Sequence, residues 1–221
     1  MRTQKTLIAS VLLTAAALTL SACGGSDQDS KADTNPVSVE SQPERKAGTV
    51  LDRPFTKPDL VLTDTRGESF DLRAKTKGKP TLLYFGYTNC PDVCPLTMGN
   101  LAQAKKQLPK ADQEQLQVIL VTTDPERDTP ASLGSWLKAQ DPAFTGLTGD
   151  FATIQAGARQ LGIAIDPPKK NAKGKVESMH GKQVIAFSPK TDQGYVLYNG
   201  DTTTIDQYAA DLPKLIKGEA P

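Results

Sequence analysis

The pattern of apolar and polar residues predicts that strands and helices alternate along most of the chain. Continuous apolar runs at residues 81–87 and 116–122 are typical of strands buried on both faces of a sheet. Two later runs, at residues 183–188 and 195–198, predict a pair of strands around a turn at residues 190–194. The chain therefore carries the elements of a central sheet.

Apolar residues at helical spacing predict four helices between and after these strands. The first helix should end before Pro109, because proline lacks the amide donor that would continue it. Asp150 is placed to cap the third helix. The predicted helices cover residues 96–108, 130–139, 150–161 and 206–217.

Three further segments complete the predicted layout. Residues 59–70 read as a hairpin that turns at residues 65–67, and residues 162–165 read as a short strand. Residues 167–178 are basic, contain glycine and proline and have no apolar face, so we expect a mobile surface loop there rather than a binding patch. Together these elements predict an α/β fold that is thioredoxin-like, with a central mixed sheet, an N-terminal hairpin and an insertion before the last strand pair.

The N-terminus has the layout of a secretory signal peptide over residues 1–22, with a basic start, an apolar run and small residues before Cys23. Residues 20–23, LSAC, resemble the bacterial lipobox, in which the cysteine is lipidated. The alternative is an ordinary signal peptide that leaves Cys23 free. We expect a lipidated flexible tether over residues 23–48 and a folded domain over residues 49–217, held at the extracytoplasmic face of the bacterial cell membrane.

Composition narrows the chemistry that the domain can perform. The 221 residues have a formal net charge of +1, which argues against a nucleic-acid partner. The chain has three cysteines and one histidine, His180. With Cys23 lipidated, Cys90 and Cys94 are the remaining thiols, in a compartment where disulfides persist.

Cys90 and Cys94 lie in the sequence YFGYTNCPDVCP at residues 84–95. Because Pro95 is favoured in the first turn of a helix, we expect the helix to begin near Pro95, with Cys94 at or near its N-cap and Cys90 in the preceding loop. A helix N-terminus favours thiolate, the form that performs redox chemistry and binds metals. A disulfide across so short a loop would stabilise the fold by only on the order of 1.5 kcal/mol. The pair alone leaves a redox dithiol and a metal site equally open.

His180 favours the metal site. It precedes the strand predicted at residues 183–188, whose start would face the cysteine loop in a thioredoxin-like fold. Two thiolates and one imidazole suit a soft ion such as Cu(I), whereas structural zinc prefers four ligands and iron–sulfur clusters usually need four cysteines. The alternative is a histidine in an exposed loop.

Other candidate ligands are weaker. Met98 follows Cys94 by one helical turn and is expected to be a core residue, and Met179 precedes His180. Asp128 is most simply a helix cap or a turn residue. The remaining carboxylates near predicted strand ends are Asp92 and Asp124, and a functional role for Asp124 or Asp128 would first be sought in partner docking.

The motifs FGYTNCPDVCP and TTDPERDTP, followed by a single histidine downstream, resemble the Sco/SenC family of membrane-tethered, thioredoxin-like proteins. The resemblance implies copper bound by Cys90, Cys94 and His180. It also implies a role in metallating the dinuclear copper A site in subunit II of cytochrome c oxidase. A family member would act by handing over copper or by reducing the cysteines of its target.

One departure from the family pattern concerns the surroundings of the histidine. Many members have Asp directly before it and Ser or Thr after it, whereas this chain has Met179 and Gly181. The departure puts in doubt a carboxylate that would orient the imidazole. Glu177 or a backbone carbonyl would have to replace it.

The first functional hypothesis is a copper chaperone, carrying Cu(I) or Cu(II), that works with the oxidase subunit II, another copper donor and a thiol reductant. The second is an enzyme, a thiol–disulfide oxidoreductase that needs Cys90 and Cys94 but not His180. A third, a peroxiredoxin-like peroxidase, is disfavoured because its P-x-x-x-[TS]-x-x-C pattern is absent.

Overall fold

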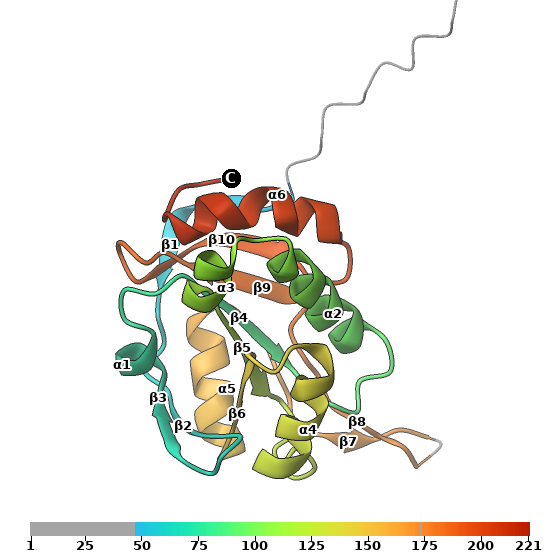
Figure 1. Cartoon of the computed structure of the whole chain (residues 1–221). Coiled ribbons are helices and arrows are strands. Elements are labelled where there is room, and N and C mark those ends of the chain that lie inside the picture. Colours follow the sequence, from blue (N-terminus) through green and yellow to red (C-terminus); the bar gives the residue numbers. More distant parts are fainter. Residues whose placement is uncertain (1–46, 173) are drawn as a thin grey trace, which may run out of the picture. The chain divides into compact units, whose positions relative to one another are not determined.

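The computed structural model describes residues 47–172 and 174–221 (Figure 1). The predicted signal peptide, Cys23 and nearly all of the predicted tether lie outside the described residues. Within the described part of the chain, every helix is too short or too polar to cross a membrane.

One sheet of eight strands is the centre of the fold, and it is mixed as predicted. Its middle strands β4, β5 and β6 run parallel, and the other neighbours are antiparallel. Across the sheet the order is β1 (Thr49–Thr56), β10 (Gln193–Asn199), β9 (Gln183–Phe187), β4 (Thr81–Gly86), β5 (Gln117–Thr122), β6 (Thr145–Thr148), β2 (Val61–Asp64) and β3 (Ser69–Asp71).

Helices cover both faces of the sheet because its central strands are apolar on both sides. In β4, Leu82 and Tyr84 face one hydrophobic cluster, and Leu83 and Phe85 face the other. The first cluster takes side chains from α2, α4 and α6, and the second from α1 and α5. α2 and α6 are neighbours (Figure 1). The helices are α1 (Leu72–Thr76), α2 (Val93–Lys106), α3 (Lys110–Gln115), α4 (Pro130–Gln140), α5 (Phe151–Gln160) and α6 (Ile205–Ile216).

The four predicted helices and the hairpin of residues 59–70 are confirmed, but one strand prediction needs correction. Residues 162–165 are not a strand. This segment is extended and buries the side chains of Ile163 and Ile165 in the second cluster, which explains the strand-like spacing of its apolar residues. Its backbone, however, stays outside the sheet. The sheet instead contains β6, which pairs with β5 and was not predicted. Gly146 in β6 has no room for a side chain, because a Cβ atom there would lie 2.6 Å from Leu137.

The segment at residues 167–178 is also more regular than predicted. It contains a short hairpin, in which β7 (Lys169–Lys170) pairs with β8 (Val176–Glu177). The predicted surface loop is therefore a β-ribbon that leads directly to His180.

Two helical glycines provide a test of this packing. Gly157→Ala in α5 should lower the free energy of unfolding by about 1–3 kcal/mol, because the new Cβ would lie 2.6 Å from the side chain of the buried Leu60. Gly99→Ala in α2 should raise it by roughly 0.5–1 kcal/mol, because the nearest atom is 3.6 Å away and alanine is the better helix former. Urea unfolding of both variants checks the opposite signs, and a stabilised Gly157→Ala protein would contradict the packing.

Candidate metal centre

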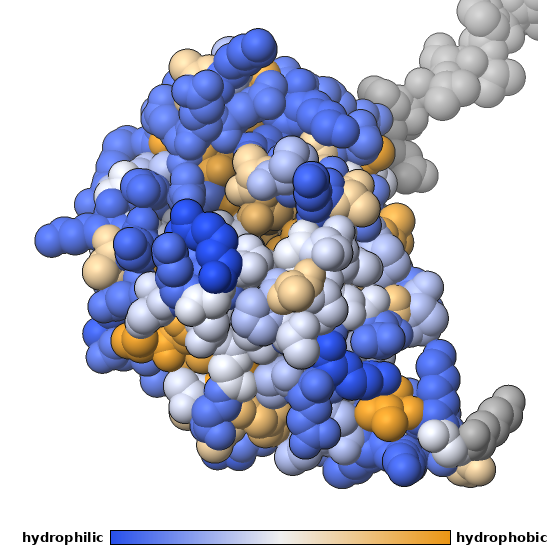
Figure 2. All heavy atoms as spheres, turned by 60° about the horizontal axis from the view of Figure 1, so that its bottom comes forward, coloured by the Kyte–Doolittle hydropathy of each residue, from blue (hydrophilic) through white to orange (hydrophobic). Residues whose placement is uncertain are grey.

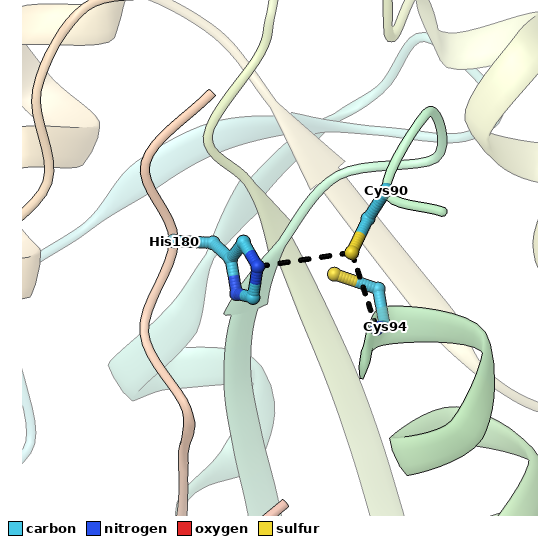
Figure 3. A group of neighbouring side chains, drawn as sticks. All are labelled: Cys90, Cys94 and His180. Carbon is cyan, nitrogen blue, oxygen red and sulfur yellow. Dashed lines mark hydrogen bonds between the residues drawn. The ribbon is translucent and has the colours of Figure 1, made fainter. Parts of the chain in front are cut away.

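The strand order brings His180 to the cysteine loop. Cys90 lies in the loop after β4, and Cys94 is the second residue of α2. His180 lies just before β9, which pairs antiparallel with β4 so that Tyr84 is opposite Val184. The end of β4 and the start of β9 therefore meet at one edge, and the three side chains point toward one another (Figure 3).

α2 begins at Val93, near Pro95 as predicted. The N-cap is Asp92, whose carboxylate accepts a hydrogen bond from the Val93 amide at 2.6 Å. Cys94 is therefore inside the first turn rather than at the cap, and Pro95 is tolerated one residue later because first-turn amides have no partner within the helix. One such amide, that of Cys94, donates to Cys90 Sγ at 3.4 Å.

The three side chains form a compact group of potential ligands. Cys90 Sγ and His180 Nε2 are 3.7 Å apart, and the ligand atoms of Cys90, Cys94 and His180 all lie within 4.8 Å of one another. Both cysteines are buried free thiols, with Cys94 fully covered, and His180 is partly exposed. No second group of three Cys, His, Asp or Glu ligands occurs among the described residues.

A backbone carbonyl orients the imidazole. His180 Nδ1 lies 2.8 Å from the carbonyl oxygen of Gly181, so Nδ1 carries the hydrogen and Nε2 faces Cys90. Glu177, the other partner considered, instead accepts a hydrogen bond from Asn171 Nδ2 at 2.7 Å. Gly181 leaves little room for a side chain, because a Cβ atom there would lie 2.8 Å from Ile163.

The two thiols differ in acidity. The hydrogen bond with Cys94, helped by His180 and the nearby amides, lowers the pKa of Cys90 to about 4 despite its burial. The same hydrogen bond and burial raise the pKa of Cys94, and the hydrogen bond with Cys90 raises the pKa of His180. In the reduced protein without metal, Cys90 is therefore the thiolate and Cys94 the thiol at neutral pH.

Asp128 holds the cysteine loop, a role that the sequence did not reveal. Its fully buried carboxylate accepts hydrogen bonds from the Thr88 amide at 2.9 Å, from the Thr88 hydroxyl and from Thr122 Oγ1 at 2.6 Å. Of the two simple roles predicted for Asp128, a helix cap or a turn residue, the cap is wrong, because Thr129 is the N-cap of α4. Asp128 instead ties the loop before Cys90 to the end of β5.

The other sequence candidates lie outside the group of ligand atoms. Met98 is fully buried in the first hydrophobic cluster, as expected for a core residue, and Met179 is 50% exposed. Asp124 forms an ion pair with Arg127, whose guanidinium lies 6.0 Å from the ring of Tyr87. That ring in turn packs against His180, with 5.5 Å between ring centroids.

Comparisons with known proteins agree on one family. A family model described as SCO1/SenC matches residues 48–217. The SCO2-like protein of Rickettsia conorii is 42% identical over 97 residues, which are 44% of this chain and 46% of that protein. The chain thus matches about half the length of this curated relative.

Two solved structures share the thioredoxin-like fold. Apo Sco1 of Thermus thermophilus is 31% identical with a TM-score of 0.65, and the match covers 76% of this chain and 96% of that one. ScoI of Bradyrhizobium japonicum, solved with copper bound, is 32% identical with a TM-score of 0.61, and the match covers 74% and 98% of the two chains. The predicted fold class is confirmed.

The acidity of Cys90 can be tested by alkylation. In the reduced, metal-free protein, the iodoacetamide reaction of Cys90 should persist from neutral pH down to mildly acidic pH. It should fall as the pH drops through about 4, because the reactive thiolate is lost below its pKa. Mass spectrometry of timed samples identifies the labelled cysteine. A midpoint near the ordinary thiol value, or faster labelling of Cys94, would contradict this account.

Asp128→Ala should destabilise the fold more than loss of an exposed helix cap. It removes a buried carboxylate and leaves its donors unpaired, so we expect a loss of about 3 kcal/mol or more. Asp150→Ala is the matched control, because Asp150 caps α5 at the exposed surface and its loss should cost clearly less than that of Asp128. Equal losses in urea unfolding would show that Asp128 does not hold the loop.

Proposed function

The chain belongs to the SCO1/SenC family, and on this premise we propose that it is an extracytoplasmic copper chaperone. It binds copper through Cys90, Cys94 and His180 and helps to assemble the dinuclear copper A centre in subunit II of cytochrome c oxidase. The observation that carries the proposal is the convergence of the two sulfurs and the imidazole nitrogen within 4.8 Å of one another.

The donor set fits copper better than other common ions. Thiolate sulfur is a soft ligand that suits Cu(I), and imidazole suits copper in either oxidation state. A structural zinc site would prefer a fourth protein ligand, and no such Cys, His, Asp or Glu joins the group among the described residues. The ScoI protein of Bradyrhizobium japonicum, whose fold this chain shares, was solved with copper bound, which supports the same cargo here.

The surroundings of the site suit transfer to a partner. Leu96 and Met179, which flank Cys94 and His180 in the sequence, are 48% and 50% exposed. Figure 2 brings the lower end of Figure 1 forward, and weakly polar residues gather in the middle of that face with hydrophilic side chains around them. The exposed apolar side chains of Leu96 and Met179 give a partner a surface to contact beside the site, and the partner's own thiolates would replace the copper ligands one by one.

The N-terminal part of the proposal concerns location. A signal peptide over residues 1–22 would direct export, and lipid on Cys23 would anchor the protein. A tether over residues 23–48 would let the domain of residues 49–217 reach a membrane-embedded oxidase.

The low pKa of Cys90, about 4, keeps a thiolate available at neutral pH, and one alternative would use it, a thiol–disulfide reductase for the cysteines of the oxidase copper site. The Cys90 thiolate would attack a partner disulfide and release one partner thiolate. The Cys94 sulfur, losing its proton, would then attack Cys90, form the Cys90–Cys94 disulfide and release the second partner thiolate. Two electrons pass to the partner, and an extracytoplasmic thiol reductant restores the dithiol.

Copper titration tests the proposed ligands. The reduced protein should bind one equivalent of copper, and Cys90→Ser, Cys94→Ser and His180→Ala should each weaken binding, because each removes one donor. Competition with a Cu(I) chelator gives the affinity. Met179→Leu is the control, since it removes a nearby thioether without touching the three donors. A wild-type protein without tight copper binding would overturn the chaperone.

His180→Ala also separates the chaperone from the reductase. A chaperone needs the imidazole, so cells that carry this variant should assemble little active oxidase. A reductase needs only the dithiol, so normal assembly with His180→Ala and failure with Cys94→Ser would favour the reductase. Assembled oxidase is measured by its copper A absorption and its oxygen consumption.

A further inference from the structure

Tyr84 lies between two of the three proposed copper ligands. Its hydroxyl oxygen is 3.4 Å from Cys94 Sγ and 3.5 Å from His180 Nδ1. The side chain comes from β4, on the face that packs against α2, and it is fully buried. Sequence reasoning treated Tyr84 only as part of an apolar strand, yet its polar end reaches the site.

The hydrogen of the Tyr84 hydroxyl points to sulfur. His180 Nδ1 already carries a hydrogen, which it donates to the Gly181 carbonyl at 2.8 Å, so Nδ1 cannot accept one from Tyr84. Cys94 Sγ can accept one and lies 3.4 Å from the hydroxyl oxygen. The phenol therefore donates to Cys94.

The ring is held firmly enough for this contact to be specific. A Cβ atom on Gly86 would lie 2.7 Å from the Tyr84 ring and 2.9 Å from Cys94 Sγ, so ring and sulfur pack against the same stretch of backbone. Tyr84 and Cys94 are both fully buried. Replacing Tyr84 by phenylalanine would keep the ring in place and remove only the hydrogen-bond donor.

We propose that Tyr84 is a positioning residue for the copper site, one that donates a hydrogen bond to the Cys94 sulfur when this sulfur binds the metal. The inference rests on the proposed function. Cys94 is fully buried, so its sulfur, once copper has displaced its proton to solvent, has no water to solvate it. A hydroxyl donor stabilises that thiolate and withdraws electron density from it, and hydrogen bonding around a copper-bound sulfur tunes the metal.

The test compares Tyr84→Phe with Tyr198→Phe. Tyr198 is the matched control because it is fully buried in the same hydrophobic cluster, and its hydroxyl donates to Asp211 Oδ2 at 3.1 Å, away from the copper ligands. Tyr84→Phe should weaken Cu(I) binding about 10–100-fold, measured by chelator competition. It should also move the Cu(II)–thiolate charge-transfer band to longer wavelength, because the sulfur becomes more electron-rich. Tyr198→Phe should change neither.

A redox measurement without copper tests the Tyr84–Cys94 hydrogen bond independently of the proposed function. In mixtures of oxidised and reduced dithiothreitol, Tyr84→Phe should shift the Cys90–Cys94 pair toward its disulfide by about 2–10-fold, because a reduced sulfur accepts the hydrogen bond better than a disulfide sulfur. A wild-type protein that binds no copper would overturn the proposed function, whereas this shift would still support the hydrogen bond. The inference is overturned if Tyr84→Phe matches the wild type in these measurements, or if Tyr198→Phe changes as much.

Discussion

Cys90 and Cys94 are two thiols buried side by side, and this constraint limits how easily both can lose their protons. Once one of them has lost its proton, burial and repulsion oppose the loss of the second. The low pKa of Cys90, about 4, and the raised pKa of Cys94 express this asymmetry. A bound cation would remove it, because positive charge stabilises both thiolates together. The site is thus half prepared for a cation, with one sulfur as a thiolate and the second held as a thiol.

The fold meets this constraint with parts of the chain that are far apart in sequence. The first turn of α2 supplies an amide to Cys90, and the antiparallel pairing of β9 with β4 places His180 opposite the loop. Asp128 fastens the same loop to the end of β5. A redox dithiol would need only the helix and the loop. The imidazole, oriented by a carbonyl so that Nε2 faces Cys90, is the part that favours a metal.

Local pattern was a good guide wherever a residue's role depends on its neighbours in sequence. The apolar run of β4 and the cap at Asp150 were predicted correctly, and motif and spacing singled out the two cysteines and His180. Prediction failed where a distant contact decides the role. Asp128, just before Thr-Pro, resembles a cap but bonds to Thr88, and Tyr84 resembles a core strand residue but reaches His180. Such contacts exist only once the sheet has formed.

We propose that Cys90, Cys94 and His180 together bind copper. X-ray absorption at the copper edge tests it most directly, because the pattern distinguishes sulfur from nitrogen and oxygen neighbours of the metal. We expect two sulfur scatterers and one imidazole nitrogen in the wild-type protein, and loss of the imidazole signal in His180→Ala. A first shell of nitrogen and oxygen alone, or a wild-type pattern retained in His180→Ala, would contradict the account.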